Sequence, residues 1–492
     1  MDFGSIMKSL EHKSILITGT SGFLAKIFME KVLRSQPNVK KLFILLRAEN
    51  DTFAAQRLQN EVFGKKVFRV LKEEHGTGFD SFISNKVTAV AGDISFENLG
   101  IKDSTLKEEM WREINLIINV AGNTTFDERY DVALSTNALG VKHICEFAKK
   151  CTKLELLFHV STAYVTRERE GIILEKPFQM EEAFGENHSF LDIAVEQKLV
   201  QERLTELQEE KATDKAIKLA MQELGLQRAR LFGWANTYVF TKVIGEMLLG
   251  HLRGDLPTVI LRPTIITSTY REPFPGWIEG FRTIDSLIVS YGKGKLNHFL
   301  ADPEAPLDVV PGDFVVNAML ATMAAHSRQC SNQFIYHVST SSRNQVKNND
   351  LVDFIYQYFS KNPCLGRDGM PVRVTRGSLL TTKTSFNNLM TVYYKLPIQV
   401  LRVVNALSFQ SLEDIYHNLN RKYTLITRFV DLYEHFAFFE ARFDDSNLKK
   451  LRMGIKDDKI TPMKFYLDPK CINWEDYFIN IHIPGLVQHS IK

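Results

Sequence analysis

The sequence predicts an α/β protein with a Rossmann-type, doubly wound parallel sheet and a mainly helical C-terminal domain. Two observations support this prediction. Short apolar runs alternate with segments of helical periodicity over about the first 170 residues, which is typical of parallel strands covered by helices on both faces. A glycine-rich turn also follows the first apolar run, as in folds that bind a dinucleotide.

Seven apolar runs are expected to be strands, the first five of them in this sheet, because they are short and bounded by turn or helix signals. They are residues 14–19, 41–47, 87–93, 116–122, 156–161, 258–263 and 333–339. The amphipathic segment 23–34 is expected to form the first covering helix, and the uncharged stretch 314–326 a buried helix.

The chain is expected to consist of a Rossmann domain over 1–343, a connecting region over 344–385 and a C-terminal domain over 386–492. The Rossmann domain has two expected insertions, a helical one at about 165–235 and a substrate-binding one at 268–310. Glu, Lys, Gln and Leu dominate the latter part of the first insertion, which predicts solvent-facing helices.

Composition restricts the class of protein. With 492 residues, 44% of them hydrophobic and 24% charged, the chain is typical of a globular protein with two or three domains, not of a disordered or fibrous one. Its 61 basic and 58 acidic residues leave a net charge of +3, so no nucleic-acid partner is expected. No secretory signal, transit peptide or membrane-spanning run is evident.

The cysteines are scattered and odd in number, and no pair shows Cys-x-x-Cys spacing. They are Cys145, Cys151, Cys330, Cys364 and Cys471. Neither a disulfide framework nor a zinc site is therefore predicted, and a reducing compartment fits best.

The turn after the first apolar run has the spacing Gly-x-x-Gly-x-x-Ala, at Gly19, Gly22 and Ala25. The first glycine permits the tight turn, the second lets the backbone approach a pyrophosphate, and the alanine lets the helix pack closely on the strand. A purely structural turn is the alternative. The residues of this turn expected to contact the cofactor are Gly19, Thr20, Gly22, Phe23, Leu24 and Ala25.

The end of the second strand bears on the choice of dinucleotide. An NAD site usually places an acidic residue there, whereas this strand ends in Arg47. A guanidinium attracts a 2′-phosphate, so NADPH is favoured, with a surface arginine as the alternative. Asp93 is expected to bond the adenine or to cap a turn. Ala121, Gly122 and Pro263 complete the expected cofactor-binding set.

Tyr238 and Lys242 are four residues apart, so they share one face of a helix. An ammonium near a phenol lowers the pKa of that phenol. The tyrosine could then exchange a proton with a carbonyl oxygen during hydride transfer, while Lys242 also bonds the nicotinamide ribose. The alternative is a solvated helix face.

Ser161 and Thr162 place hydroxyl groups at the end of the fifth strand. One of them could bond the substrate carbonyl and help to stabilise the developing oxyanion. If the strand continues, the two side chains point to opposite faces, so only one can do this; Thr162 is favoured.

These residues resemble the extended short-chain dehydrogenase/reductase superfamily. Longer segments resemble alcohol-forming fatty acyl-CoA reductases, the plant branch above all. They are Thr18-Gly-Thr-Ser-Gly-Phe-Leu-Ala-Lys26, His159-Val-Ser-Thr-Ala-Tyr-Val165, Leu261-Arg-Pro-Thr-Ile-Ile266, Glu272-Pro-Phe-Pro-Gly-Trp-Ile-Glu-Gly280, Leu307-Asp-Val-Val-Pro-Gly-Asp313, Arg442-Phe-Asp-Asp-Ser-Asn447 and Asn473-Trp-Glu-Asp-Tyr-Phe478. The resemblance covers essentially the whole chain.

The resemblance implies NADPH-dependent reduction of a long-chain acyl-CoA to a primary alcohol through an enzyme-bound aldehyde, in wax, suberin or cuticle lipid metabolism. Tyr238 would be the proton donor, Lys242 its partner and Thr162 the holder of the carbonyl. The connection between Thr162 and Tyr238 is longer than is usual in the superfamily, and Thr166-Arg167 replaces the Asn-Gly of many relatives.

In this mechanism no acyl-cysteine is needed, so Cys145 and Cys151 are expected to be buried or incidental. The phosphates of CoA need cations, for which Arg271, Arg282, Lys293 and Lys295 are candidates, with ordinary surface charges as the alternative. Apolar residues between Met390 and Phe439 are expected either to line the acyl channel or to form core.

Three alternatives remain open: a reductase that releases the aldehyde, a reductase or epimerase acting on another carbonyl compound, and a dinucleotide-binding sensor without catalysis. A poorly soluble substrate and a membrane-soluble product suggest peripheral association with the cytoplasmic side of the endoplasmic reticulum. The basic, amphipathic stretch 393–402 is a candidate membrane contact, although a core helix is the preferred interpretation.

Overall fold

A computed structural model describes residues 2–167, 170–178, 191–327, 333–366, 368–407, 412–455 and 465–490. Cys330 lies outside these ranges. Within them, none of the helices combines the length and the apolar character needed to cross a membrane.

The centre of the fold is a parallel sheet of seven strands in the order β11-β7-β5-β4-β1-β2-β3. All seven apolar runs form its strands, as β1 (Ser14–Thr18), β2 (Lys41–Leu46), β3 (Val87–Ala91), β4 (Leu116–Asn119), β5 (Leu156–Val160), β7 (Thr258–Pro263) and β11 (Gln333–Val338). The predicted α/β class is thereby confirmed. The strand order reverses between β1 and β4, whose registered ends are Thr18 and Asn119.

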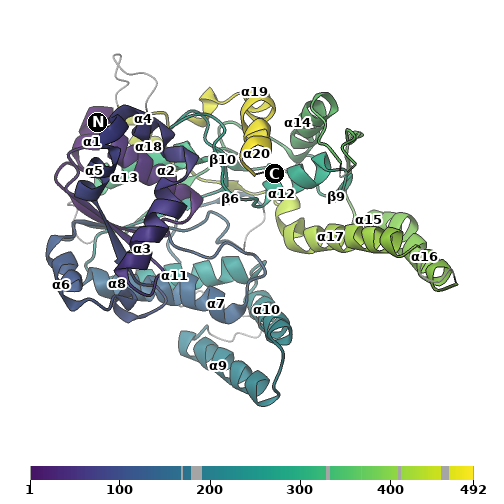
Figure 1. The fold of residues 1–492 in the computed structure, drawn as a ribbon, viewed down its shortest axis with the longest axis horizontal. Coiled ribbons are helices and arrows are strands. Elements are labelled where there is room, and N and C mark those ends of the chain that lie inside the picture. The colour runs from purple at the N-terminus through teal and green to yellow at the C-terminus, as the bar shows by residue number, and fades with distance from the viewer. Residues whose placement is uncertain are drawn as a thin grey trace.

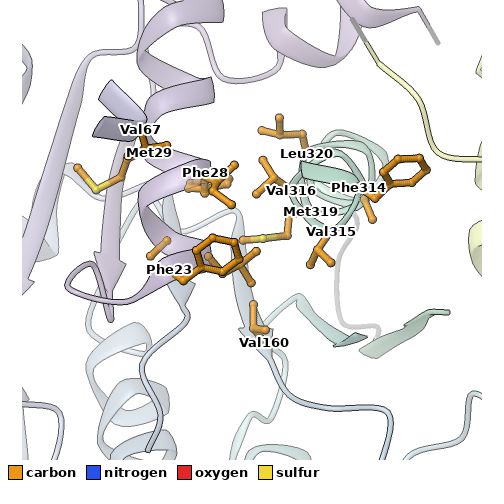
Figure 2. Packing of buried hydrophobic residues seen from close by; sticks show 14 of the residues in the cluster. Phe23, Phe28, Met29, Val67, Val160, Phe314, Val315, Val316, Met319 and Leu320 are labelled. Carbon is orange, nitrogen blue, oxygen red and sulfur yellow. The ribbon is translucent and has the colours of Figure 1, made fainter. Parts of the chain in front are cut away.

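Helices cover both faces of the sheet, because successive residues of each buried strand point to opposite sides. One face packs against α2 (Phe23–Ser35) and α13 (Gly312–His326), the two helices expected from the apolar pattern. Figure 2 shows Phe28 of α2 meeting Val316 and Met319 of α13. The other face packs against α6 (Ser104–Glu113), α8 (Gly140–Ala148) and α11 (Thr237–Leu252).

The charged segment forms two helices, α9 (Ile193–Glu209) and α10 (Asp214–Leu231), which lie together at one side of the molecule (Figure 1). Side chains of Asp192 and Thr213 cap their N-termini. Before them, the short strand β6 (Ile172–Ile173) pairs with β13 (Arg442–Phe443) of the C-terminal region.

The C-terminal region is tied to the segment around residues 265–311. Strand β9 (His298–Leu300) makes this link by pairing with β12 (Ser378–Leu380). Within the segment itself, β8 (Ile265–Thr267) pairs with β10 (Val309–Pro311). Apart from the helices of residues 383–437, the remaining α-helices of the C-terminal half are α12 (Ile284–Gly292), α14 (Asn348–Lys361), α18 (Ser446–Met453), α19 (Trp474–Asp476) and α20 (Ile483–Ser490). Those of the N-terminal part are α1 (Phe3–Lys8), α3 (Asp51–Arg57), α4 (Arg69–His75), α5 (Phe79–Lys86) and α7 (Tyr130–Leu134).

An arm of helices projects from this body (Figure 1). It consists of α15 (Lys383–Met390), a π-helical turn (Thr391–Lys395), α16 (Leu396–Leu407) and α17 (Glu413–Ala437). The interpretation of 393–402 as a core helix is wrong. The stretch is helical, but none of its side chains is buried, and Tyr393, Leu396 and Val400 are exposed.

Candidate active site

A cavity of about 930 Å³ opens at the carboxyl ends of β1, β2, β4, β5 and β7, where the strand order reverses. In open parallel sheets this is the position at which ligands bind. The cavity continues past α11 to side chains of α12, α14 and α17. The cofactor-binding region and the candidate substrate-binding region are therefore parts of one space.

The glycine turn forms one end of the cavity. Gly19 has a φ of +73°, and a Cβ there would lie 2.6 Å from the backbone nitrogen of Ala121, so a side chain is excluded. Gly22 precedes α2, which has no side-chain cap, so its first N–H groups are available to a phosphate. Thr20 Oγ1 is buried and has no hydrogen-bond partner among the described residues. This cradle fits a dinucleotide pyrophosphate.

The other residues expected in this turn take two different positions. Phe23 and Leu24 line the cavity. Ala25 is fully buried in the core and lies outside the cavity lining, where its small side chain allows α2 to pack closely.

No role was predicted for Lys26 from the sequence, yet this residue holds the glycine turn in place. Its buried ammonium donates a hydrogen bond to the carbonyl oxygen of Ser21 at 2.8 Å and forms an ion pair with Glu279. The turn is therefore tied to the segment that contains Glu279, 253 residues further along the chain.

Two arginine side chains line the cavity at the end of β2. Arg47 is exposed on the cavity wall, as expected. Arg57, which the sequence analysis missed, also lines the cavity, donates a hydrogen bond to the carbonyl oxygen of Arg47 at 2.5 Å and pairs with Glu61. Arg57 reaches this position because α3 begins soon after β2 ends. Arg47 therefore places positive charge beside this end of the cavity, whereas the charge of Arg57 is shared with Glu61.

The remaining expected cofactor residues all lie on the cavity wall: Asp93, Ala121, Gly122 and Pro263. The carboxylate of Asp93 accepts a hydrogen bond from the Ser95 backbone nitrogen at 2.9 Å, so it caps a turn as well as facing the cavity. A Cβ on Gly122 would lie 3.3 Å from Asn137 Oδ1. Asn137, another residue that the sequence analysis missed, also donates a hydrogen bond to Thr241 Oγ1 at 3.0 Å.

Tyr238 and Lys242 occupy the first turns of α11, which the Asn236 side chain caps. Lys242 is buried, and its ammonium donates a hydrogen bond to the carbonyl oxygen of Val160 at 2.8 Å. Burial lowers the pKa of Lys242 to about 8, while Glu246 acts in the opposite direction. Burial raises the pKa of Tyr238 to about 12, although the hydrogen bond with Thr162 and the charge of Arg282 act against this rise.

The expectation that Lys242 lowers the pKa of Tyr238 is therefore wrong for this structure. One hydrogen bond of the ammonium goes to the Val160 carbonyl, and burial of the phenol outweighs the groups that favour its ionised form. At neutral pH the phenol is protonated, which is the state that a proton donor requires.

Ser161 and Thr162 both lie on the cavity wall. β5 runs to Val160, and its pairing with β7 continues beyond that residue, because the backbone nitrogens of Ser161 and Ala163 donate to the carbonyl oxygens of Leu261 and Pro263 at 2.8 and 2.9 Å. Thr162 lies close enough to Tyr238 for its hydroxyl to favour the ionised form of the phenol and so oppose the rise in its pKa. Ser161 Oγ is buried without a partner among the described residues.

Helix α17 forms the far wall of the cavity. Its lining side chains are mainly apolar: Leu425, Ile426, Phe429, Val430, Leu432, Tyr433 and Phe436. The rings of Tyr433 and Phe436 lie 5.6 and 5.2 Å from that of Phe126, which stacks on Tyr238 at 5.8 Å. An ion pair of 2.9 Å between Arg428 and Asp127 adds a second link across the cavity. Apolar side chains between residues 390 and 439 therefore do both things that the sequence allowed: those of α17 line the cavity, and Met390 and Ile426 belong to a buried apolar cluster.

The candidate cations and cysteines differ in whether they line the cavity. Arg282 lines the cavity, whereas Arg271, Lys293 and Lys295 lie outside its lining. Cys145 and Cys151 are buried, and burial raises the pKa of their thiols to about 11 and about 12. Both thiols are therefore protonated at neutral pH and are poor nucleophiles.

Comparison with known proteins agrees with this architecture. An NAD-binding family model described as "Male sterility protein" matches residues 17–319, and a second model with the same description matches residues 393–492. The chain is 50% identical to the alcohol-forming fatty acyl-CoA reductase of Simmondsia chinensis over 100% of both chains. It is 49% identical to fatty acyl-CoA reductase 1 of Arabidopsis thaliana over 98% of both.

Solved structures with much lower sequence identity share the fold. The terminal reductase domain of the myxalamid biosynthetic pathway matches with a TM-score of 0.56 at 15% identity, over 97% of this chain and 91% of that one. A thiolation-reductase di-domain of an archaeal nonribosomal peptide synthetase matches with a TM-score of 0.55 at 15% identity, over 99% and 81%.

The pKa of Lys242 predicts a pH dependence of binding. The ammonium form can donate hydrogen bonds to a bound nicotinamide dinucleotide, so we expect affinity to be constant below pH 8 and to fall about tenfold as the lysine loses its proton above it. Titration followed by the fluorescence of the reduced nicotinamide measures this. Lys242→Met should bind more weakly and without this step, whereas Lys293→Ala should keep it. A flat profile to pH 10 for the unmodified protein would contradict the assignment.

Proposed function

This chain belongs to the fatty acyl-CoA reductase family, and we propose that it reduces a long-chain fatty acyl-CoA to the primary fatty alcohol with NADPH. One observation carries the proposal: a single cavity connects the dinucleotide cradle at Gly19 with the Thr162–Tyr238 pair and with the apolar wall of α17. The reaction needs these three features together: a hydride donor, a group that activates the carbonyl, and space for a long apolar chain.

NADPH is proposed over NADH because Arg47 and Arg57 line the cavity at the end of β2. A 2′-phosphate there would meet two guanidinium groups, which bind phosphate oxygens in a planar, charge-assisted geometry. The carboxylates nearest to the end of β2 in the sequence, Glu49 and Asp51, lie outside the cavity lining, so neither is placed to favour a free 2′-hydroxyl.

In the proposed mechanism, Thr162 and Tyr238 hold the oxygen of the thioester carbonyl through their hydroxyl groups. When bound, NADPH supplies the hydride that the carbonyl carbon receives. Tyr238 gives its proton to the oxygen as negative charge develops there, and the Thr162 hydroxyl and the charge of Arg282, which favour the ionised phenol, stabilise the phenolate that results. The high pKa of Tyr238 keeps this proton in place beforehand.

The remaining steps release CoA and reduce the aldehyde. Loss of the CoA thiol leaves an aldehyde, whose carbonyl oxygen meets the same two hydroxyl groups for a second reduction. Overall, one acyl-CoA, two NADPH and two protons give one alcohol, one CoA and two NADP⁺. Cys145 and Cys151 take no part, since both thiols are buried and protonated.

The substrate would enter with its two ends in different environments. Arg282, on the cavity wall near Tyr238, is proposed to meet phosphate groups of CoA, and the apolar face of α17 to meet the acyl chain. The C-terminal domain, proposed to begin at about residue 386, would thus complete the site of the N-terminal reductase domain. Apolar products of this kind suit wax, suberin or cuticle lipids and association with the endoplasmic reticulum.

Product analysis tests the function directly. We expect purified protein incubated with NADPH and long-chain acyl-CoAs to form primary alcohols, with two NADPH oxidised per acyl group, as measured by gas chromatography and absorbance. Accumulation of aldehyde with one NADPH oxidised would contradict the four-electron reaction. Binding of NADPH without turnover of any acyl-CoA would reject the reductase assignment itself.

Tyr238→Phe tests the proton donor. Because the ring stays and only the hydroxyl is lost, we expect kcat to fall by about 10²- to 10⁴-fold with little change in NADPH affinity. Tyr433→Phe is a matched control, since it removes a hydroxyl from another cavity-lining tyrosine; its kcat should stay within a few-fold of the unmodified value. Near-full activity of Tyr238→Phe would remove this residue from the mechanism.

Arg47→Ala tests the cofactor preference. Loss of a charge-assisted hydrogen bond to the 2′-phosphate should raise KM for NADPH by about 10- to 100-fold and leave KM for NADH nearly unchanged. Steady-state kinetics with both cofactors measures the ratio. Arg203→Ala, on the exposed surface of α9, is the control. An equal rise in both KM values would argue against a role of Arg47 in selecting NADPH.

A further inference from the structure

Helix α16 has an exposed apolar face, which we name the α16 stripe: Leu396, Val400, Val403, Val404 and Leu407. These side chains are between 41% and 77% exposed. Their spacing of three and four residues places them on one side of the helix, the pattern by which an amphipathic helix normally faces a core. Here that side faces outward, and exposed Val392 and Tyr393 extend it into the preceding turn.

The stripe belongs to a helix that is held against α17. The opposite side of α16 packs on α17. The buried Asn405 side chain accepts a hydrogen bond from the Leu412 backbone nitrogen at 2.9 Å and donates one to Glu413 at 2.5 Å. These bonds hold α16 against the start of α17, so the orientation of the stripe is fixed by packing.

No other described part of the surface concentrates exposed apolar residues in this way. Seven large hydrophobic side chains are exposed within residues 392–407, whereas those elsewhere, such as Phe96, Val195, Leu219 and Met453, are spread over separate elements. Single exposed apolar residues are normal in proteins, but a contiguous patch marks a surface that binds a protein or a membrane.

The charge around the stripe favours an anionic lipid surface. Residues 383–407 contain Lys383, Lys395 and Arg402 and no acidic residue. Lys383 pairs with Glu434 at 2.9 Å, whereas Lys395 and Arg402 are exposed and form no ion pair with the described residues. An apolar face flanked by free cations is the pattern of helices that lie in the headgroup region of a membrane. A symmetric contact between two copies would instead bring these like charges together.

The base of the stripe adjoins the cavity. The ring of Tyr393 lies 6.4 Å from that of His298, and His298 lines the cavity. Phe386 and Met390 of α15 pack in one apolar cluster with Leu296, Leu300 and Ile426, of which the last three also line it. The arm therefore joins the apolar cavity wall to the exposed apolar surface.

We propose that the α16 stripe, with Val392 and Tyr393, docks on an anionic phospholipid surface and lies in its plane. Docking in this orientation sets the apolar end of the cavity beside the lipid. The cavity would then receive a long acyl chain from the lipid. This second step rests on the proposed function, whereas the docking itself does not. A helix of 12 residues is about 18 Å long, which suits contact along the interface.

Vesicle flotation tests the docking without any substrate. We expect the purified protein to float with vesicles of phosphatidylcholine and phosphatidylserine, and less with phosphatidylcholine alone. The combined variant Leu396→Gln, Val400→Gln, Val403→Gln and Leu407→Gln should bind at least about tenfold more weakly, because four apolar side chains no longer enter the interface. Lys395→Glu with Arg402→Glu should lose the preference for phosphatidylserine.

A matched control carries four comparable changes outside the arm: Phe96→Gln, Val195→Gln, Leu219→Gln and Met453→Gln. It should float like the unmodified protein. Thermal unfolding and turnover of a short, soluble acyl-CoA should be unchanged in the stripe variant, because its four residues lie outside the cavity lining. Absence of turnover in every form would count against the proposed function and leave the flotation result valid.

Two outcomes would overturn the docking proposal. The first is equal flotation of the stripe variant and the unmodified protein. The second is that the unmodified protein does not float and that light scattering shows a dimer for it but a monomer for the stripe variant. The stripe would then be a contact between two copies.

Discussion

The reversal of strand order between β1 and β4 is the constraint on which the site depends. At a reversal the carboxyl ends of neighbouring strands are left uncovered, so backbone and side chains there can face a ligand. Close approach of the strands then forbids a side chain at Gly19. Thr18 donates to Asn119 at 2.6 Å, and the Asn119 amide contacts His159 at 3.1 Å, so one chain of hydrogen bonds aligns β1, β4 and β5.

A second joint links the helix of the Tyr–Lys pair to this edge. The hydrogen bond from Lys242 to the Val160 carbonyl fixes α11 against the end of β5, next to Ser161 and Thr162. Burial at this joint has opposite effects on the two partners, because it disfavours whichever form is charged: the pKa of Lys242 falls and that of Tyr238 rises. The position of α11 thereby sets both the geometry and the protonation states of the pair.

Helix α17 gives the arm two roles. Its C-terminal half closes the cavity through Phe429, Tyr433 and Phe436, and its N-terminal half supports α16. The helix is about 15 Å long from Ile426 to Phe436. At Ile426 it packs in the apolar cluster with Leu296 and Leu300, and at Phe436 it reaches the aromatic residues beside Tyr238. The reacting end of the cavity, its apolar end and the exposed stripe are thus arranged along one element.

The sequence by itself determined the features that depend on local spacing: the seven strands, the glycine turn and the shared face of Tyr238 and Lys242. Packing between distant segments decided the rest. Hydrogen bonds that no sequence motif predicts place Arg57, Asn137 and Lys26 at the site. The sign of the Tyr238 pKa shift and the exposure of α16 were predicted wrongly for the same reason. Periodicity defines which residues share a face, whereas only the tertiary structure decides what covers that face.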